Sequence, residues 1–267
     1  RYETGTPVDE LHIVGDTDIT GTVVTFKPDP NIFTDTTVFD YDTLLTRLRE
    51  QAFLNAGVKI ILSDSRSTEP EQRSDTLHYE GGIRSYVEFI MSHSKRTPLH
   101  DTPIYLSVSG EKHSAEIALL FNDGYDTKII SFANNIHTVD GGTHESAFKT
   151  ALTRTINNYG RRFKMLKDND PNLKGEDIQE GLVAVISVKL QDAQFEGQTK
   201  SKLGNTSMGT VVNNLVNQQL SDYLEKNPAV AKVILEKSMA ASNAREAAQK
   251  ARDLQRSKSG MSRVRMP

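Results

Sequence analysis

Apolar residues recur at two different spacings along this chain of 267 residues, and each spacing predicts a type of secondary structure. Short apolar runs rich in β-branched residues predict strands at 11–14, 23–26, 58–62, 104–108, 115–121, 128–133 and 182–188. Apolar residues three and four positions apart predict helices at 41–54, 83–91, 143–156, 206–226 and 229–258. The polar stretch at 63–74 predicts a loop.

Turn-forming residues mark the ends of several of these elements. Asp40 is expected to cap the first helix at its start and Gly57 to close it. Residues 122–125, Asn-Asp-Gly-Tyr, predict a β-hairpin that joins the strands on either side. Thr143 is expected to cap the next helix. The order strand, strand, strand, helix, strand, helix implies an α+β fold, a sheet with its helices on one side.

The bulk composition excludes several classes of protein. A net charge of -3 is not that of a basic nucleic-acid coat protein, and the absence of cysteine excludes disulfides and thiolate metal sites. No apolar run approaches a membrane span and no signal peptide opens the chain, so we expect a cytoplasmic protein without a membrane partner. His144-Glu145 lacks the second histidine of a zinc helix, and there is no glycine-rich nucleotide loop.

The polar loop after the strand at 182–188 has the strongest chemical character. It reads QFEGQTKSKLGN over 194–205 and leads into the helix at 206. Gln198, Lys200 and Lys202 can present amide and ammonium donors to an anion such as phosphate. The alternative interpretation is a solvated basic loop, since isolated loop lysines are usually exposed.

The last predicted helix is basic toward its end. Its cations run from Arg245 through Arg252 to Arg265, with few acids between them. Two interpretations stay open: a solvated helix face, or a helix that lies near DNA phosphates.

Six motifs resemble the gyrase B proteins, which are part of the type IIA topoisomerase DNA gyrase, and together they cover nearly the whole chain. They are GDTDITGT at 15–22, RLREQAFLN at 47–55, NNIHT at 134–138 with GGTHE at 141–145, GEDIQEGL at 175–182, QTK at 198–200 and AREAA at 244–248. Arginine is commoner in this family where Gln179 stands. The corresponding subunit of topoisomerase IV shares much of the pattern and remains an alternative.

The resemblance implies three parts. Residues 1–82 would be the C-terminal part of a GHKL ATPase domain, 83–226 a transducer domain, and 227–267 a helical connection toward the TOPRIM domain. The transducer of the family has a ribosomal-protein-like sheet with a left-handed βαβ crossover, against the usual handedness of such units. The chain opens on Arg1, and we expect it to be a fragment.

The resemblance also assigns roles to single residues. Lys200 would be the catalytic ATP sensor, with Gln198 beside it; Gly21 and Thr22 would lie in the ATP pocket near the adenine. A basic residue at the position of Lys149 would face the DNA cavity in the family, and Arg154 on the same helix is a further DNA-binding candidate. Arg245 and Arg252 are the DNA-binding candidates of the basic helix. Lys202 is expected to face solvent.

The implied cofactors are ATP and Mg²⁺, whose metal ligands lie in motifs that this sequence lacks. The implied partners are DNA and gyrase A, with homodimerisation through the ATPase region. The fragment alone is not expected to hydrolyse ATP, because the water-activating base is missing. A non-enzymatic nucleic-acid-binding module, with the basic helix as its arm, is the competing interpretation.

Overall fold

The computed structural model describes residues 1–66, 73–167 and 169–263, and the chain divides into two compact units, Arg1–Arg47 and Leu48–Pro267. The domain boundaries expected at 82 and 226 stay predictions. In the first unit only β1 (Tyr2–Glu3) and β2 (Thr6–Pro7) pair among the described strands.

The strands predicted at 11–14 and 23–26 do not form. Both segments are irregular, and their apolar side chains, such as Leu11 and Ile13, are exposed. A β-strand needs a neighbour to bond its backbone N–H and C=O groups, and neither segment pairs with a described strand. Their sequence pattern was therefore not sufficient.

The first predicted helix is confirmed as α1 (Tyr41–Leu54). The Thr43 N–H donates to Asp40 Oδ1 at 2.7 Å, as expected of a helix cap, and Gly57 adopts a φ of +82° just after the helix. A two-stranded hairpin follows, of β3 (Lys59–Ser63) and β4 (Ser74–His78). Of the loop predicted at 63–74, residues 67–72 lie outside the described residues. The sequence pattern missed β4.

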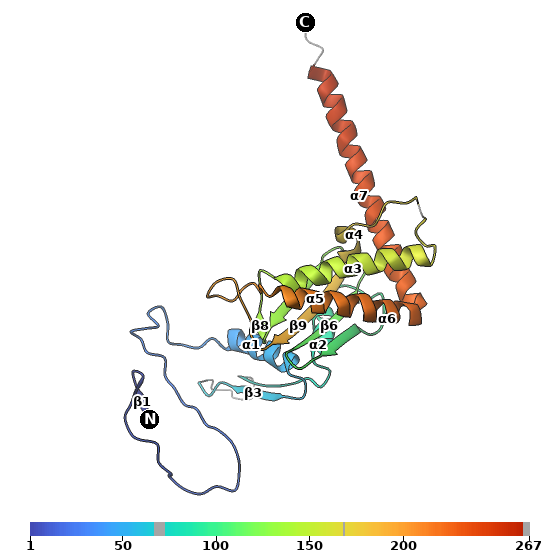
Figure 1. Cartoon of the computed structure of the whole chain (residues 1–267). Helices are drawn as coiled ribbons and strands as arrows, with labels where there is room; N and C mark the ends of the chain where they lie inside the picture. Colours follow the sequence, from blue (N-terminus) through green and yellow to red (C-terminus); the bar gives the residue numbers. More distant parts are fainter. Residues whose placement is uncertain (67–72, 168, 264–267) are drawn as a thin grey trace. The chain divides into compact units, whose positions relative to one another are not determined.

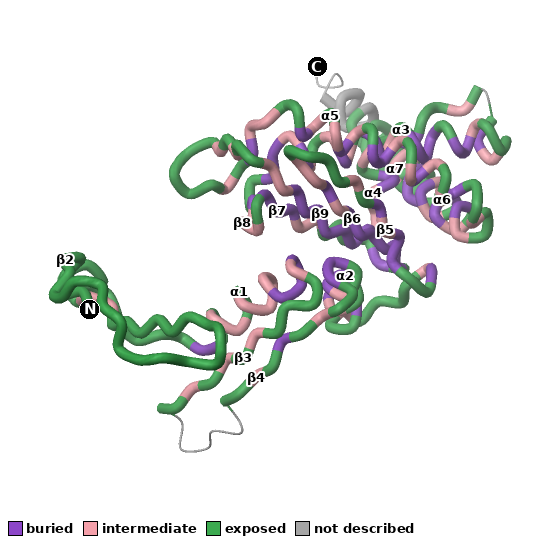
Figure 2. Tube along the Cα trace, turned by 60° about the horizontal axis from the view of Figure 1, so that its bottom comes forward, coloured by how far each residue is buried: buried purple, intermediate pink, exposed green. Residues whose placement is uncertain are grey.

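The second unit contains a five-stranded sheet with α3 (Thr143–Arg162) and α5 (Thr206–Leu215) beside it (Figure 1), and its strand order is β5-β6-β9-β7-β8 (Figure 2). Its strands are β5 (Ile104–Ser109), β6 (His113–Phe121), β7 (Lys128–Ala133), β8 (Ile136–His137) and β9 (Leu182–Leu190). All neighbours are antiparallel except β7 and β9, which run parallel. The mixed α+β class is confirmed.

The hairpin predicted between β6 and β7 is wrong, because β9 lies between these two strands. The turn itself forms, with the Gly124 N–H donating to Asn122 Oδ1 at 2.8 Å. Every residue of β9 from Leu182 to Val188 is buried. Both faces of this strand are mainly apolar, so a central position in the sheet, covered on both sides, removes the most apolar surface from water. The hairpin that does form joins β7 to β8. Its two-residue turn is Asn134-Asn135, whose φ values of 50° and 63° fit a type I′ turn.

Helices cover both faces of the sheet, so the expectation of helices on one side is wrong (Figure 2). On one face, α2 (Ile83–Ser92) and the end of α1 enclose a core against alternate residues of β6 and β9. On the other face, α3 and α5 bury the larger core. The short helix α4 (Gly175–Gln179) precedes β9.

The helical C-terminal part continues from α5 through the π-helix η2 (Val216–Leu220) into α6 (Ser221–Lys226). Within η2, Gln219 bonds both backbone groups of Ser107 on the edge strand β5, at 3.0 and 2.8 Å. A side chain thus occupies hydrogen-bonding groups that an edge strand otherwise leaves open. The predicted break at Asn227-Pro228 is confirmed, and α7 (Pro228–Arg263) follows it.

Gly142, rather than Thr143, precedes α3 as its capping residue. Thr143 is the first helical residue, and its hydroxyl donates to the Asn205 carbonyl oxygen at 2.6 Å. Gly142 has a φ of 143°, and a Cβ placed there would lie 2.5 Å from the Leu203 carbonyl oxygen. The close approach of two backbones at this point therefore requires glycine.

This contact gives a first prediction. Gly142→Ala should lower the free energy of unfolding by about 3 kcal/mol, because it adds both a backbone clash and an unfavourable φ. Urea unfolding of the purified chain measures the loss. Gly204→Ala, where the new Cβ would meet the nearest atom at 3.4 Å, is the control and should cost less than about 1 kcal/mol. Equal losses for the two variants would contradict this account of Gly142.

Candidate functional site

The loop between β9 and α5 is a small hairpin of its own. Phe195 and Leu203 form an antiparallel bridge, and the Glu196 N–H donates to the Lys202 carbonyl oxygen at 2.9 Å. These contacts close the base of the loop and leave residues 197–201 as its tip. We call residues 194–204 the lysine loop.

Two lysines of the lysine loop have different surroundings. Lys202 forms an ion pair with Glu196, with 3.1 Å between Nζ and Oε2. Lys200 lies at the exposed tip and forms no ion pair among the described residues; its Nζ is 6.0 Å from the centroid of the Phe195 ring. Its φ of 55° lies in the left-handed region, which is uncommon for a residue with a side chain. Gln198, also exposed, lies two residues before it.

The base of the lysine loop is bonded to the start of α3. The Thr143 N–H donates to the Leu203 carbonyl oxygen at 3.0 Å, and the Leu203 N–H donates to the Gly141 carbonyl oxygen at 3.1 Å. The Asp140 N–H donates to the Ser201 carbonyl oxygen at 2.9 Å. Leu203 itself is fully buried in the core. Backbone hydrogen bonds therefore join the base of the lysine loop to the first turn of α3.

Lys149 and Arg154 lie on α3, and both have partners within the chain. Lys149 Nζ is 2.6 Å from Glu145 Oε1, and Arg154 donates to the side-chain oxygens of Asn213 and Asn217. Both residues line a groove of about 560 Å³ along α3 and the start of α4. The groove thus presents cations that are held in place by neighbouring side chains.

Arg245 and Arg252 lie on α7 in different environments. Arg245 forms two hydrogen bonds, of 2.7 and 2.9 Å, to the two carboxylate oxygens of Asp177 on α4. Arg252 is exposed and donates to Gln249 on its own helix. Arg265, at the end of the basic run, lies outside the described residues. The guanidinium of Arg245 therefore ties α7 to α4.

Asp177 is only 2% exposed, so its charge depends on this pairing. Burial alone would raise the pKa of Asp177, but hydrogen bonds from Arg245 and from the Lys174 N–H outweigh it and hold that pKa below its usual range. Asp177 lies within the GEDIQEGL motif, but no role was predicted for it. The residues around it, Lys174 to Glu180, are mostly polar, so the local sequence did not mark Asp177 as a buried acid.

Gly21 and Thr22 lie in the first compact unit, in irregular and exposed chain. Their predicted place beside an adenine therefore stays a prediction. No helix among the described residues is long and apolar enough to cross a membrane. Nor do the described residues group three or more metal-binding side chains, so they do not fit as a Mg²⁺ site.

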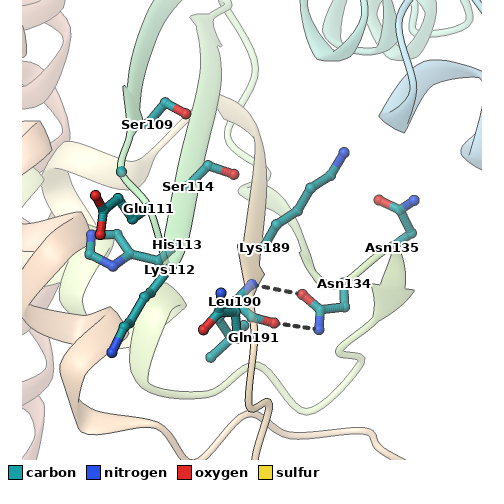
Figure 3. A pocket seen from close by; sticks show the side chains of 11 residues that line it. Ser109, Glu111, Lys112, His113, Ser114, Asn134, Asn135, Lys189, Leu190 and Gln191 are labelled. Carbon is teal, nitrogen blue, oxygen red and sulfur yellow. Dashed lines mark hydrogen bonds between the residues drawn. The ribbon is translucent and has the colours of Figure 1, made fainter.

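A further pocket of about 470 Å³ lies where β5 and β9 end and β6 begins, and two lysines line it (Figure 3). Lys112 and Lys189 point in opposite directions there, and Asn134 exchanges two hydrogen bonds of 2.9 Å with the backbone of Leu190. The two ammonium groups therefore do not converge on a common point in this pocket. The lysine loop and the groove on α3 remain the candidate sites.

Comparisons with known proteins point in one direction. A family model described as DNA gyrase B matches residues 82–254. The DNA gyrase B protein of Halalkalibacterium halodurans is 51% identical over 269 residues, and that of Clostridium acetobutylicum is 50% identical over 267 residues. Each alignment covers 100% of this chain and 41% of the relative, so the chain spans less than half of their length.

Solved structures show the same similarity. The 43K ATPase domain of Thermus thermophilus gyrase B, in complex with an aminocoumarin, matches with a TM-score of 0.73 and 38% identity, over 86% of this chain and 60% of that chain. The topoisomerase IV ATP binding domain of Francisella tularensis matches with a TM-score of 0.65 over 79% of this chain and 55% of that chain. At 24% identity the second match concerns the fold alone.

The buried pair gives a second prediction. Asp177→Asn should lower the free energy of unfolding at pH 7 by about 3 kcal/mol, because Arg245 loses its buried bidentate partner and keeps only the exposed carboxylate of Glu176 beside it. The folded pKa of Asp177 is depressed, so the pair stabilises the fold above the unfolded pKa of about 4 and this stability is lost as pH falls below it. Urea unfolding at pH 7, 5 and 3.5 should therefore show that the free energy of unfolding falls less between pH 7 and pH 3.5 in the variant than in the unchanged protein.

The matched control is Glu176→Gln. Glu176 also lies 3.3 Å from Arg245, but its side chain is 62% exposed, so its loss should cost less than about 0.5 kcal/mol. If Asp177→Asn and Glu176→Gln had the same small effect, the pair would not hold α7 to α4.

Proposed function

The chain belongs to the DNA gyrase B family, and on this premise we propose that it is the ATP-sensing transducer part of a bacterial ATP-dependent type II DNA topoisomerase. In the complete protein it would couple ATP binding and hydrolysis to DNA strand passage and supercoiling. The observation that carries the proposal is the lysine loop. At its exposed tip the loop offers Lys200, a cation without an ion pair among the described residues, and at its base it is bonded to α3.

The proposed organisation has three parts. Residues 1–82 belong to the end of a GHKL ATPase domain, 83–226 form the transducer, and 227–267 lead toward the TOPRIM domain. The five-stranded sheet is proposed to be the ribosomal-protein-like sheet of the transducer, and the connection from β7 through α3 to β9 its left-handed crossover. Parallel pairing of β7 with β9 supports a βαβ unit at this place.

We assign the γ-phosphate of ATP to Lys200. The negative charge on the transferred phosphate spreads as its bond to the leaving group breaks, and a positioned ammonium stabilises that charge. Gln198 can hold a phosphate oxygen or orient the attacking water through its amide. Gly21 and Thr22 are proposed to lie near the adenine. Mg²⁺ would be held by residues outside this chain.

Binding of the phosphate at the tip would pull the lysine loop. Because Leu203 is bonded to Gly141 and Thr143, the pull reaches the first turn of α3 through backbone hydrogen bonds. After hydrolysis the contact with the γ-phosphate is lost and the loop is released. The lysine loop is then a two-state element that one phosphate biases.

DNA is proposed to meet the groove on α3 and the exposed part of α7. Lys149 and Arg154 line the groove, and Arg252 lies on α7. Arg245, which the basic charge pattern of α7 also suggested as a DNA contact, contributes mainly through its pair with Asp177. The proposed partners are DNA, gyrase A and a second copy of the complete gyrase B protein, in the cytoplasm. The chain alone is proposed to have no ATP turnover.

The third prediction separates the two lysines of the loop. In the complete gyrase B protein, Lys200→Ala should lower ATP turnover at least about 100-fold, because the charge that develops on the phosphate loses its ammonium. Nucleotide affinity should stay within about tenfold, or 1.4 kcal/mol, since most contacts to ATP lie elsewhere. Steady-state ATPase and nucleotide-binding assays measure the two quantities.

Lys202→Ala is the matched control. It removes the same charge two residues away, where Glu196 already neutralises it, so turnover should change little. Equal and small effects of the two substitutions would make the lysine loop an ordinary basic connection and contradict the proposed sensor.

The fourth prediction concerns the groove on α3. Lys149→Gln in the complete enzyme should weaken the DNA-stimulated ATPase about fivefold, the effect of one phosphate contact of about 1 kcal/mol, and the basal ATPase less. ATP turnover with and without linear DNA measures both rates. An equal fall in both rates would indicate a folding defect and contradict a DNA contact at Lys149.

A further inference from the structure

A chain of buried polar groups lies beneath the first turn of α3. His144 is fully buried, and its Nε2 lies 3.2 Å from Thr138 Oγ1. Ser131 Oγ is 2.8 Å from Thr138 Oγ1 and 2.8 Å from Glu145 Oε2. Glu145 Oε1, its other carboxylate oxygen, accepts from Lys149 Nζ at 2.6 Å. Four side chains thus connect the sheet to the cation in the α3 groove.

The hydrogens along this chain can be ordered. Burial lowers the pKa of His144 to about 4, so near neutral pH its ring is uncharged and carries one N–H. Thr138 can donate its one hydroxyl hydrogen to Ser131, either to the carbonyl oxygen at 2.9 Å or to Oγ at 2.8 Å, so Thr138 Oγ1 can accept from His144. A hydrogen on Nε2 leaves Nδ1, which has no partner among the described residues, as a bare acceptor. We assign this tautomer because a buried N–H group without an acceptor is rarer in proteins than a buried acceptor without a donor.

Ser131 then has one hydroxyl hydrogen, and the carboxylate of Glu145 is its charged acceptor at 2.8 Å. This bond fixes Glu145 against β7. The carboxyl group also lies against Gly141, where an added Cβ would be 3.2 Å from it. Gly141 is the residue whose carbonyl oxygen accepts from Leu203 of the lysine loop. Glu145 therefore lies between the base of the lysine loop and Lys149.

We propose that Glu145 is a positioning residue. Its carboxylate pairs with the Lys149 ammonium as a substitute for a DNA phosphate, until a phosphate of the duplex displaces the carboxylate. The proposal rests on the proposed function, in which Lys149 meets the duplex. The side chain of Glu145 is 17% exposed and that of Lys149 is 41% exposed, so Lys149 has the greater access to solvent. Because Ser131 and the sheet hold the carboxylate, Glu145 does not follow Lys149 toward the duplex. It competes with phosphate for the ammonium.

The test uses the complete gyrase B protein in complex with gyrase A, with ATP turnover measured against increasing linear DNA. Glu145→Gln keeps the shape of the side chain and an acceptor for Ser131, but removes the charge that competes for Lys149. The DNA concentration at half-maximal stimulation should fall about two- to fivefold, as expected for the loss of one partly exposed ion pair.

Two further variants identify the cause. Adding Glu145→Gln to Lys149→Gln should produce no further change, because the competitor and its target act as one pair. Glu236→Gln, which removes the acid of another i,i+4 pair, with Lys232 on α7, should leave the half-maximal concentration unchanged.

The outcomes separate this proposal from the function on which it rests. An unchanged half-maximal concentration in Glu145→Gln, while Lys149→Gln loses stimulation, overturns the role of Glu145 and leaves that of Lys149 intact. Normal stimulation in Lys149→Gln means that the DNA contact proposed for Lys149 is wrong. A proportional fall of the basal and stimulated rates in Glu145→Gln, with a lowered melting temperature, assigns Glu145 a structural role and also overturns the proposal.

Discussion

The burial of β9 on both faces organises the second unit. Seven consecutive residues, from Leu182 to Val188, are buried, and α2 and α3 lie on opposite sides of the sheet that contains them. Since parallel neighbours cannot be joined by a tight turn, the pairing of β7 with β9 requires a long crossover, and α3 provides it. The end of the same strand delivers the chain to the lysine loop. The core therefore positions both the strand that leads into the lysine loop and the helix that contacts its base.

Electrostatics within the chain then decides which cations are available. Lys202, Arg245 and Lys149 each have an acidic partner, whereas Lys200 has none among the described residues. A cation with a neighbouring carboxylate is already partly neutralised, so an arriving phosphate must compete with that acid. Lys200 instead lies at the exposed tip of its loop, with a backbone φ of 55° in the left-handed region. The difference between equivalent-looking lysines comes from what surrounds them.

Several local patterns in the sequence were reliable. The bounds of α1 and β7 and the break before α7 followed from spacing and capping residues alone. The family resemblance followed from short motifs, including the loop that contains Lys200. The strands predicted at 11–14 and 23–26 did not form. A suitable local pattern forms a strand only when a partner strand is present to bond its backbone. The turn at Asn122 formed, yet the sequence could not indicate which strands would be neighbours.

By itself, the sequence determined the types of most elements and the family, and it singled out the loop that contains Lys200. These properties depend on residues within about one element of each other, where period and capping chemistry act. Tertiary structure alone decided that β9 lies between β6 and β7, that helices cover both faces of the sheet, and that Asp177 forms an ion pair with Arg245. It also brought Ser131, His144 and Glu145 together beneath α3. These outcomes depend on contacts between distant segments, and they are chosen by burial and charge pairing that no local period records.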